Sequence, residues 1–103
     1  MNAYVLSEDA GLDLDDIWEY IARDNIDAAD QWTGKLFDAF EAIGRTPGIG
    51  HKRENLTGCY PVLFFPVGAY LIIYRATLPT VEIVAVSQGG RDIPSFLRRR
   101  FSR

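Results

Sequence analysis

Residues that bind metal ions or form disulfides are scarce in this sequence. Cys59 is the only cysteine and His51 is the only histidine among the 103 residues. A single thiol cannot form an internal disulfide, and a structural zinc site needs several cysteine or histidine ligands. We therefore expect no metal site, no cofactor and no internal disulfide.

Long apolar runs are missing as well. The most apolar stretch, residues 60–74, is interrupted by Pro61, Pro66 and Gly68 and is shorter than the roughly 20 apolar residues of a membrane-spanning helix. The N-terminal residues also lack the basic start, apolar run and small-residue cleavage site of a secretory signal. We expect a cytoplasmic protein that does not associate with a membrane.

The charges that are present are divided unequally along the chain. Residues 1–43 carry a formal charge of −9 and residues 44–103 a charge of +6. Such a division predicts opposed electric fields and therefore different partners for the two parts. With 48% hydrophobic residues, the chain suffices for one core and is too short for two, so we predict a single domain over residues 1–103.

Two segments have the periodicity of amphipathic helices. The first follows Ser7, a candidate N-cap, and we expect the second to begin after an N-cap at Asp27 and to end at Gly44. The short link between them predicts an antiparallel helical hairpin. The apolar positions of the two stripes are Ala10, Leu14, Ile17, Trp18 and Ile21, and then Ala29, Trp32, Leu36, Ala39, Phe40 and Ile43.

Short apolar segments elsewhere predict strands. Residues 4–6 form a first strand, and residues 60–65, 69–76 and 81–87 form an antiparallel meander because the turns between them are short. Residues 70–74 are apolar at every position, as in a central strand, and Pro61 indicates an edge strand or a strand start. In the last strand, Val81, Ile83, Ala85 and Ser87 alternate with the other side chains.

Basic residues dominate the remaining segments. Residues 45–58 contain Pro47, several glycines and the polar residues His51, Lys52 and Arg53, which predicts an exposed loop. The tail after Asp92 has Pro94 in a suitable first helical turn and ends in several arginines. We expect a short basic helix or arm there.

This order of elements resembles the RelE/ParE toxin superfamily, and in particular its ParE branch. The resemblance implies an α+β fold in which an N-terminal strand and an antiparallel helical hairpin pack on a twisted antiparallel β-sheet. The segments that carry it are residues 4–7, Ala10 with residues 13–21, the apolar positions Ala29, Leu36 and Phe40, and residues 47–50, 65–75 and 90–94.

Membership of this superfamily implies a toxin of a type II toxin–antitoxin pair. Its expected partner is a ParD-like antitoxin, a ribbon-helix-helix DNA-binding protein, and operator DNA is bound only through that antitoxin. Apolar stripe edges and an edge strand suit an added helix and strand physically. The candidates for the antitoxin groove are Trp18, Ile21, Trp32, Leu36 and Phe40.

The same superfamily allows two kinds of target. RelE-like members cut messenger RNA on the ribosome, which requires cationic groups and a proton donor at the scissile phosphate. Lys52, Arg53, Arg75 and Arg91 are available as cations, but no tyrosine or histidine follows Tyr74. We therefore predict no catalytic residues and a ParE-like action on DNA gyrase. A ribosome-dependent endoribonuclease remains the alternative, as does a degenerate toxin that acts only in antitoxin binding and co-repression.

The cationic second part supplies the candidates for target binding. Arg98, Arg99 and Arg100 are either a solubilising tail or a contact with DNA, gyrase or an acidic antitoxin. Arg91 and Asp92 match the end of the last strand in ParE toxins, although Asp92 also suits a helix cap. The full set is Arg75, Arg91, Asp92, Arg98, Arg99 and Arg100, with His51, Lys52 and Arg53 of the basic loop as secondary candidates.

Overall fold

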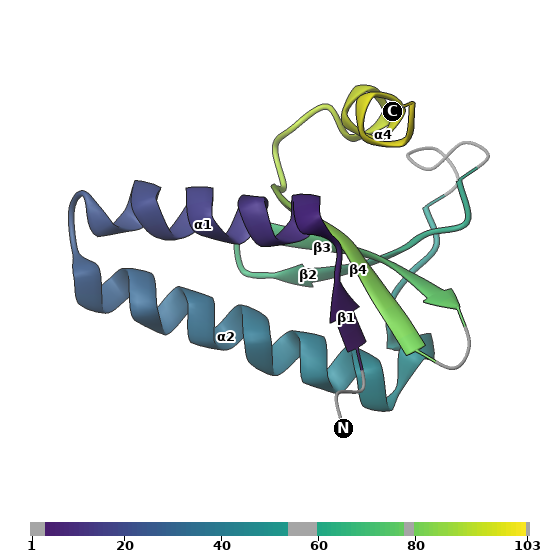
Figure 1. Ribbon diagram of the computed structural model, residues 1–103, viewed down its shortest axis with the longest axis horizontal. Coiled ribbons are helices and arrows are strands. Elements are labelled where there is room, and N and C mark those ends of the chain that lie inside the picture. Colours follow the sequence, from purple (N-terminus) through teal and green to yellow (C-terminus); the bar gives the residue numbers. More distant parts are fainter. Residues whose placement is uncertain (1–3, 54–59, 78–79, 103) are drawn as a thin grey trace.

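The computed structural model describes residues 4–53, 60–77 and 80–102, and Figure 1 shows its elements. The predicted loop residues 54–58 and Cys59 lie outside the described residues. The elements are β1 (Tyr4–Leu6), α1 (Glu8–Ala22), α2 (Ile26–Arg45), the 3₁₀ turn η1 (Pro47–Ile49), β2 (Leu63–Val67), β3 (Tyr70–Thr77), β4 (Thr80–Gln88) and α4 (Ile93–Phe101).

The strands form one sheet in the order β1-β4-β3-β2. Strands β2, β3 and β4 are antiparallel neighbours, which confirms the predicted meander and its central strand. Strand β1 pairs in parallel with β4, with Tyr4 opposite Val81 and Leu6 opposite Ile83. The sheet is therefore mixed. Strand β2 begins at Leu63, so Pro61 precedes it and the predicted start at residue 60 was too early.

Side chains at the ends of α1 and α2 determine where these helices begin. The Ser7 hydroxyl accepts a hydrogen bond from the Ala10 N–H at 3.0 Å, which confirms Ser7 as the cap of α1. Asn25 and not Asp27 caps α2, because its extended backbone presents its side-chain oxygen to the Ala28 N–H at 3.0 Å. The predicted cap at Asp27 was therefore wrong.

The C-terminal end of α2 also differs from the expectation. Gly44 lies inside the helix, which continues to Arg45, and Thr46 ends it with an extended φ of −137°. The residue before a proline is disfavoured in helical conformation, so Pro47 stops the helix without a left-handed glycine. Among the described residues, only Gly68, in the β2–β3 turn, has a positive φ.

Two separate cores lie on the two faces of the sheet, so the fold has three layers (Figure 1). The α1–α2 hairpin covers one face, where Leu36, Phe40 and Tyr74 are completely buried. Helix α4 covers the other face and packs Phe96 and Leu97 against the strands. Within the described part of the chain, no helix is both long and apolar enough to cross a membrane.

A β-bulge in β4 changes which side chains share a face. Ile73 is opposite Ala85 and Tyr74 is opposite Ile83, so Val84 is an extra residue in β4. The strict alternation expected from the sequence is therefore broken. Val81 and Ile83 face the hairpin, whereas Ala85 packs with α4. At this bulge, the Val84 carbonyl accepts hydrogen bonds from the side chains of Ser7 and Arg100.

Candidate functional site

Helix α4 is held at its start by a cap and along its length by apolar side chains. Asp92 accepts a hydrogen bond from the Ser95 N–H at 3.2 Å and another from the Ser95 hydroxyl at 2.9 Å. Pro94 occupies the first turn, where its missing N–H costs nothing. Ile93, Phe96 and Leu97 are buried against the sheet. The predicted basic tail is therefore a helix.

The Asp92 carboxylate shows the electrostatic consequence of this cap. Hydrogen bonds from the Ser95 N–H and hydroxyl lower its pKa, and the nearby charges of Arg98 and Arg99 lower it further. These contacts establish a structural role for Asp92. Its side chain is exposed, so a contact with a target remains compatible with that role.

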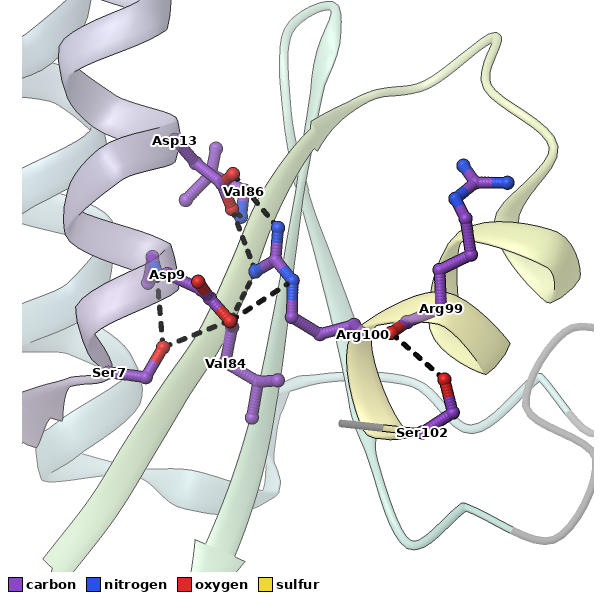
Figure 2. Close-up of polar contacts among 9 residues, drawn as sticks. Ser7, Asp9, Asp13, Val84, Val86, Arg99, Arg100 and Ser102 are labelled. Carbon is purple, nitrogen blue, oxygen red and sulfur yellow. Dashed lines mark hydrogen bonds and ion pairs between the residues drawn. The ribbon is translucent and has the colours of Figure 1, made fainter.

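Arg100 ties α4 to α1 and to the bulge in β4 (Figure 2). Its guanidinium forms an ion pair with Asp13 at 3.0 Å and donates to the Val84 carbonyl at 2.9 Å. It also lies 3.6 Å from an oxygen of Asp9. The Ser7 hydroxyl donates to the same Val84 carbonyl at 3.2 Å. We call this arrangement the Arg100 clasp.

The Arg100 clasp requires a correction to one candidate for target binding. Only 12% of the Arg100 side chain is exposed, and 15% of the Asp13 side chain. Asp13 also accepts a hydrogen bond from the Val86 N–H at 3.0 Å, so its carboxylate connects α1 with both β4 and α4. Because Arg100 is largely buried and ion-paired, it is a structural residue and not the exposed cation expected from the sequence.

Arg75 has similar internal partners. It forms an ion pair with Glu82 on the neighbouring strand at 2.6 Å, and its guanidinium lies 5.4 Å from the centre of the Phe101 ring. Phe101 in turn stacks on Tyr60 at 4.8 Å. Arg75 therefore helps to fix the end of α4, and Glu82 compensates its positive charge.

Among the described residues that follow β4, the exposed arginines are Arg91, Arg98 and Arg99. Arg98 donates to the Ser95 hydroxyl at 2.9 Å, and Arg91 lies over the Phe96 ring at 4.8 Å. Figure 2 shows the Arg99 side chain pointing away from the Arg100 clasp. Arg91, Arg99 and Arg100 line a cleft of about 350 Å³ together with Phe96. The structure thus brings Arg91 and Arg99 together at one cleft.

The basic loop is fixed to the sheet at one point by its backbone. His51 exchanges two backbone hydrogen bonds with Phe64, both at 2.8 Å, while its side chain and those of Lys52 and Arg53 are exposed. The buried Tyr74 hydroxyl donates to the Pro47 carbonyl and accepts from the Gly50 N–H at 2.9 Å. Burial raises the pKa of Tyr74, and the Gly50 hydrogen bond lowers it by less.

Tyr20 and Tyr70 line a cleft together with the exposed Arg91. Among the described residues, Tyr70 and Tyr74 are buried, and burial raises the pKa of both hydroxyls. No group of three or more histidine, cysteine, aspartate or glutamate residues suited to a metal ion occurs in residues 4–53, 60–77 and 80–102.

The hairpin has an apolar groove, and Trp18 is the only one of the five predicted groove residues that lines it. Leu36 and Phe40 are completely buried in the core, so they have no surface to offer a partner and these two assignments were wrong. Trp18, Ile21 and Trp32 are half-buried. Trp18 lines a groove of about 470 Å³, whereas Trp32 packs on Tyr70 of the sheet.

Two large apolar residues of this groove, Leu12 and Phe37, were not among the five groove candidates predicted from the sequence. Leu12 is 55% exposed and Phe37 is 39% exposed, and both line the groove beside Trp18. The signal was available, since both are large apolar residues outside the two helical stripes. We call this feature the hairpin groove; its lining is Leu6, Glu8, Gly11, Leu12, Leu14, Asp15, Trp18, Thr33 and Phe37.

The chain is similar to a ParE family model and to a named ParE toxin. The family model described as the ParE toxin of type II toxin-antitoxin system, parDE, matches residues 4–93. Toxin ParE1 of Caulobacter vibrioides is 36% identical over 87 residues, which cover 84% of this chain and 88% of that protein. The family match ends at the first residue of α4, so Arg98, Arg99 and Arg100 lie beyond it.

The fold is also found in a solved structure. A chain described as the chromosomal ParDE TA system from P. aeruginosa superposes with a TM-score of 0.67. The match covers 85% of this chain and 98% of that chain, at 14% sequence identity. This likeness confirms the α+β architecture expected from the sequence.

Proposed function

The chain belongs to the ParE toxins of type II toxin–antitoxin systems, and from this premise we propose that it inhibits DNA gyrase and is neutralised by a ParD-like antitoxin. The observation that carries the proposal is the family match over residues 4–93. The resemblance to ParE toxins implies that the toxin stalls gyrase while the DNA bound to gyrase is cleaved. The toxin acts in this proposal by binding, without a chemical step of its own.

The target-binding surface proposed here is centred on Arg91, Arg98 and Arg99. These side chains are exposed, and exposed guanidinium groups form strong, directional hydrogen bonds with carboxylates and phosphates. Lys52 and Arg53 of the basic loop are exposed as well and are secondary candidates together with His51. Arg75 and Arg100 support this surface through their ion pairs with Glu82 and Asp13.

The antitoxin-binding surface proposed here is the hairpin groove. Leu12, Trp18 and Phe37 give it an apolar wall, and an apolar groove between helices accepts the apolar face of an amphipathic helix. Such a helix from a ParD-like antitoxin would bury surface that is exposed in the isolated toxin. Operator DNA is then bound through the ribbon-helix-helix part of the antitoxin and not by the toxin.

The environments of Arg75 and Tyr74 favour inhibition of gyrase over cleavage of messenger RNA. Arg75 is paired with Glu82 at 2.6 Å, so its charge is compensated where a nuclease would use it to stabilise the phosphorane. Tyr74 is completely buried and its hydroxyl is engaged by the loop backbone. These contacts suit a structural role better than proton transfer.

Expression of the toxin without its antitoxin separates the possible functions. We expect double-strand DNA breaks, induction of the SOS response and filamentous cells, while transcript ends remain unchanged. Rapid appearance of new messenger RNA ends on ribosomes without DNA breaks would establish the nuclease alternative. Normal growth together with antitoxin-dependent repression would identify a degenerate toxin.

A further inference from the structure

Arg91 lies at the boundary between two clefts of opposite character. On one side, a cleft of about 230 Å³ is lined by Asp13, Asp16, Ile17, Tyr20, Tyr70, Val86, Ser87, Gln88 and Arg91. We call it the acidic cleft. On the other side lies the cleft lined by Arg91, Phe96, Arg99 and Arg100, which we call the arginine cleft. Neither includes the residues of the hairpin groove.

The acidic cleft has the composition of a pocket for a lysine or arginine side chain. Ile17, Tyr20 and Tyr70 supply apolar and aromatic surface against which the aliphatic stem of such a side chain can lie. Asp16 is exposed at the same cleft and supplies a carboxylate for the cationic head. Tyrosine rings also attract cations through their faces. Asp13 is already occupied by Arg100.

The arginine cleft has the composition of a pocket for a carboxylate. The Arg100 charge is compensated by Asp13, so Arg91 and Arg99 provide the positive charge available to a ligand. The Arg91 guanidinium lies over the Phe96 ring at 4.8 Å, and Arg100 lies over it at 4.7 Å. A guanidinium stacked on a ring keeps its N–H groups directed outward, in a geometry that matches a carboxylate.

The proximity of the two clefts selects between a nucleic acid and a polypeptide. A nucleic acid strand carries negative charge at every phosphate, and a strand lying across Arg91 would bring phosphates to Asp16. A polypeptide can instead carry one charge of each sign. We propose that the two clefts form one site for a polypeptide segment of the target that carries a basic and an acidic side chain a few residues apart. This inference rests on the proposed function.

Titration of the full-length ¹⁵N-labelled toxin with short peptides tests the chemistry of this site. The probes are glycine–serine peptides with one lysine and one glutamate separated by a few residues, alongside peptides that carry only the lysine or only the glutamate. We expect the mixed-charge peptide to bind most tightly and to shift the signals of Ser87, Gln88 and the Arg91 side chain. A single-stranded oligonucleotide should bind more weakly than that peptide.

Two substitutions and two matched controls assign the binding to the clefts. Asp16→Asn and Arg99→Gln should each weaken binding of the mixed-charge peptide by a factor of about 1.4 to 5, because an exposed charge pair contributes about 0.2–1 kcal/mol. Asp38→Asn and Arg45→Gln make the same changes at exposed positions of α2 that line neither cleft, and they should leave the affinity unchanged.

The inference is overturned if the mixed-charge peptide does not bind the folded toxin. Equal effects of all four substitutions, or tighter binding of the oligonucleotide, would overturn it too. Gyrase is absent from this titration, so its outcome is independent of the proposed function. A toxin that binds the peptide at these clefts but leaves gyrase supercoiling unaffected would contradict gyrase as the target while retaining the site for a different protein target.

Discussion

Three consecutive arginines on α4 have different environments at the scale of single residues. Each residue of an α-helix is rotated by about 100° from the one before it, so neighbours in sequence cannot share a direction. Arg98 contacts Ser95 near the start of its own helix, Arg99 lines the arginine cleft, and Arg100 forms the clasp with Asp13 and Val84. The presence of three consecutive arginines in the sequence could not distinguish these roles.

Arg100→Gln should destabilise the protein without removing a target contact. The substitution breaks the ion pair with Asp13 and the hydrogen bond to the Val84 carbonyl, and leaving such partly buried groups without a partner costs about 1–3 kcal/mol. Urea denaturation followed by circular dichroism measures the change in the free energy of unfolding. The matched substitution Arg99→Gln, at an exposed position, should change it by less than about 0.5 kcal/mol. Equal losses for both variants would contradict the clasp.

Tyr74 gives the protein a predictable sensitivity to alkaline pH. Burial raises the pKa of Tyr74 above its ordinary value of 10.0. The protonated hydroxyl therefore favours the folded state, and this contribution is complete below pH 10 and is lost as the pH rises through the folded-state pKa. Burial raises the pKa of Tyr4 and Tyr70 as well, so they contribute in the same direction.

Tyr74→Phe should reduce stability at neutral pH and flatten its decline at alkaline pH. The neutral effect arises because the Pro47 carbonyl and the Gly50 N–H lose their partner, which costs about 1–3 kcal/mol. The alkaline effect arises because one ionisable group is removed. Unfolding free energies measured between pH 8 and 11 test both. An unchanged slope above pH 10 would show that Tyr74 does not ionise as described.

At the scale of elements, the attachment of α4 depends on its cap and on its apolar face. Asp92→Ala removes both hydrogen bonds to Ser95, so the α4 amides should exchange with solvent severalfold faster. Asp92→Asn retains a capping oxygen, because asparagine is as effective at this position, and should keep the exchange slow. Hydrogen–deuterium exchange resolved at α4 measures both variants. Fast exchange in both, or in neither, would contradict capping as the basis of attachment.

Most elements were predictable from the sequence because each depends on a local pattern. The helical stripes, the Ser7 cap and the three antiparallel strands follow from spacing and from residue type. The parallel pairing of β1 with β4 joins residues distant in sequence, and the bulge at Val84 depends on pairing with β3. Such features arise from tertiary packing and therefore could not be read from local periodicity.

The candidate sites were predictable only in part, for a related reason. Exposed arginines are expected of any basic tail, but the meeting of Arg91 and Arg99 at one cleft was not predicted. The buried position of Arg100 depends on Asp9 and Asp13 of α1, which lie far away in sequence. Leu36 and Phe40 belonged to a recognised apolar stripe, but the centre of a stripe faces the core and only its margins can face a partner.

At the scale of the whole molecule, most of the opposed charges lie in different layers. Most acidic residues of the first part lie on the α1–α2 hairpin, whereas Arg98 and Arg99 lie on α4, on the other face of the sheet. Arg91 precedes α4 and lines a cleft with Asp16 and Tyr20 of α1. The hairpin groove is likewise lined by β1, α1 and α2 and by no residue of α4. This separation allows the antitoxin and the target to be recognised by different surfaces.

Substitutions on the two surfaces should therefore have separate effects. Leu12→Ser and Phe37→Ser in the hairpin groove should weaken neutralisation by the antitoxin while toxicity is retained. Arg91→Ala and Arg99→Ala should lower toxicity severalfold with little change in stability or antitoxin binding. Growth assays with and without the co-expressed antitoxin, together with copurification, distinguish these effects. If either pair affected toxicity and neutralisation alike, the two surfaces would not be independent.

DNA gyrase activity in the presence of the purified toxin tests the central claim most directly. Relaxed plasmid, gyrase and ATP are incubated with increasing amounts of toxin, and supercoiled and linear products are separated by electrophoresis. We expect supercoiling to decrease and linear DNA to accumulate, with Arg91→Ala shifting both responses to higher toxin concentration. Full supercoiling without linear DNA, at a toxin excess that still arrests growth in cells, would contradict the account.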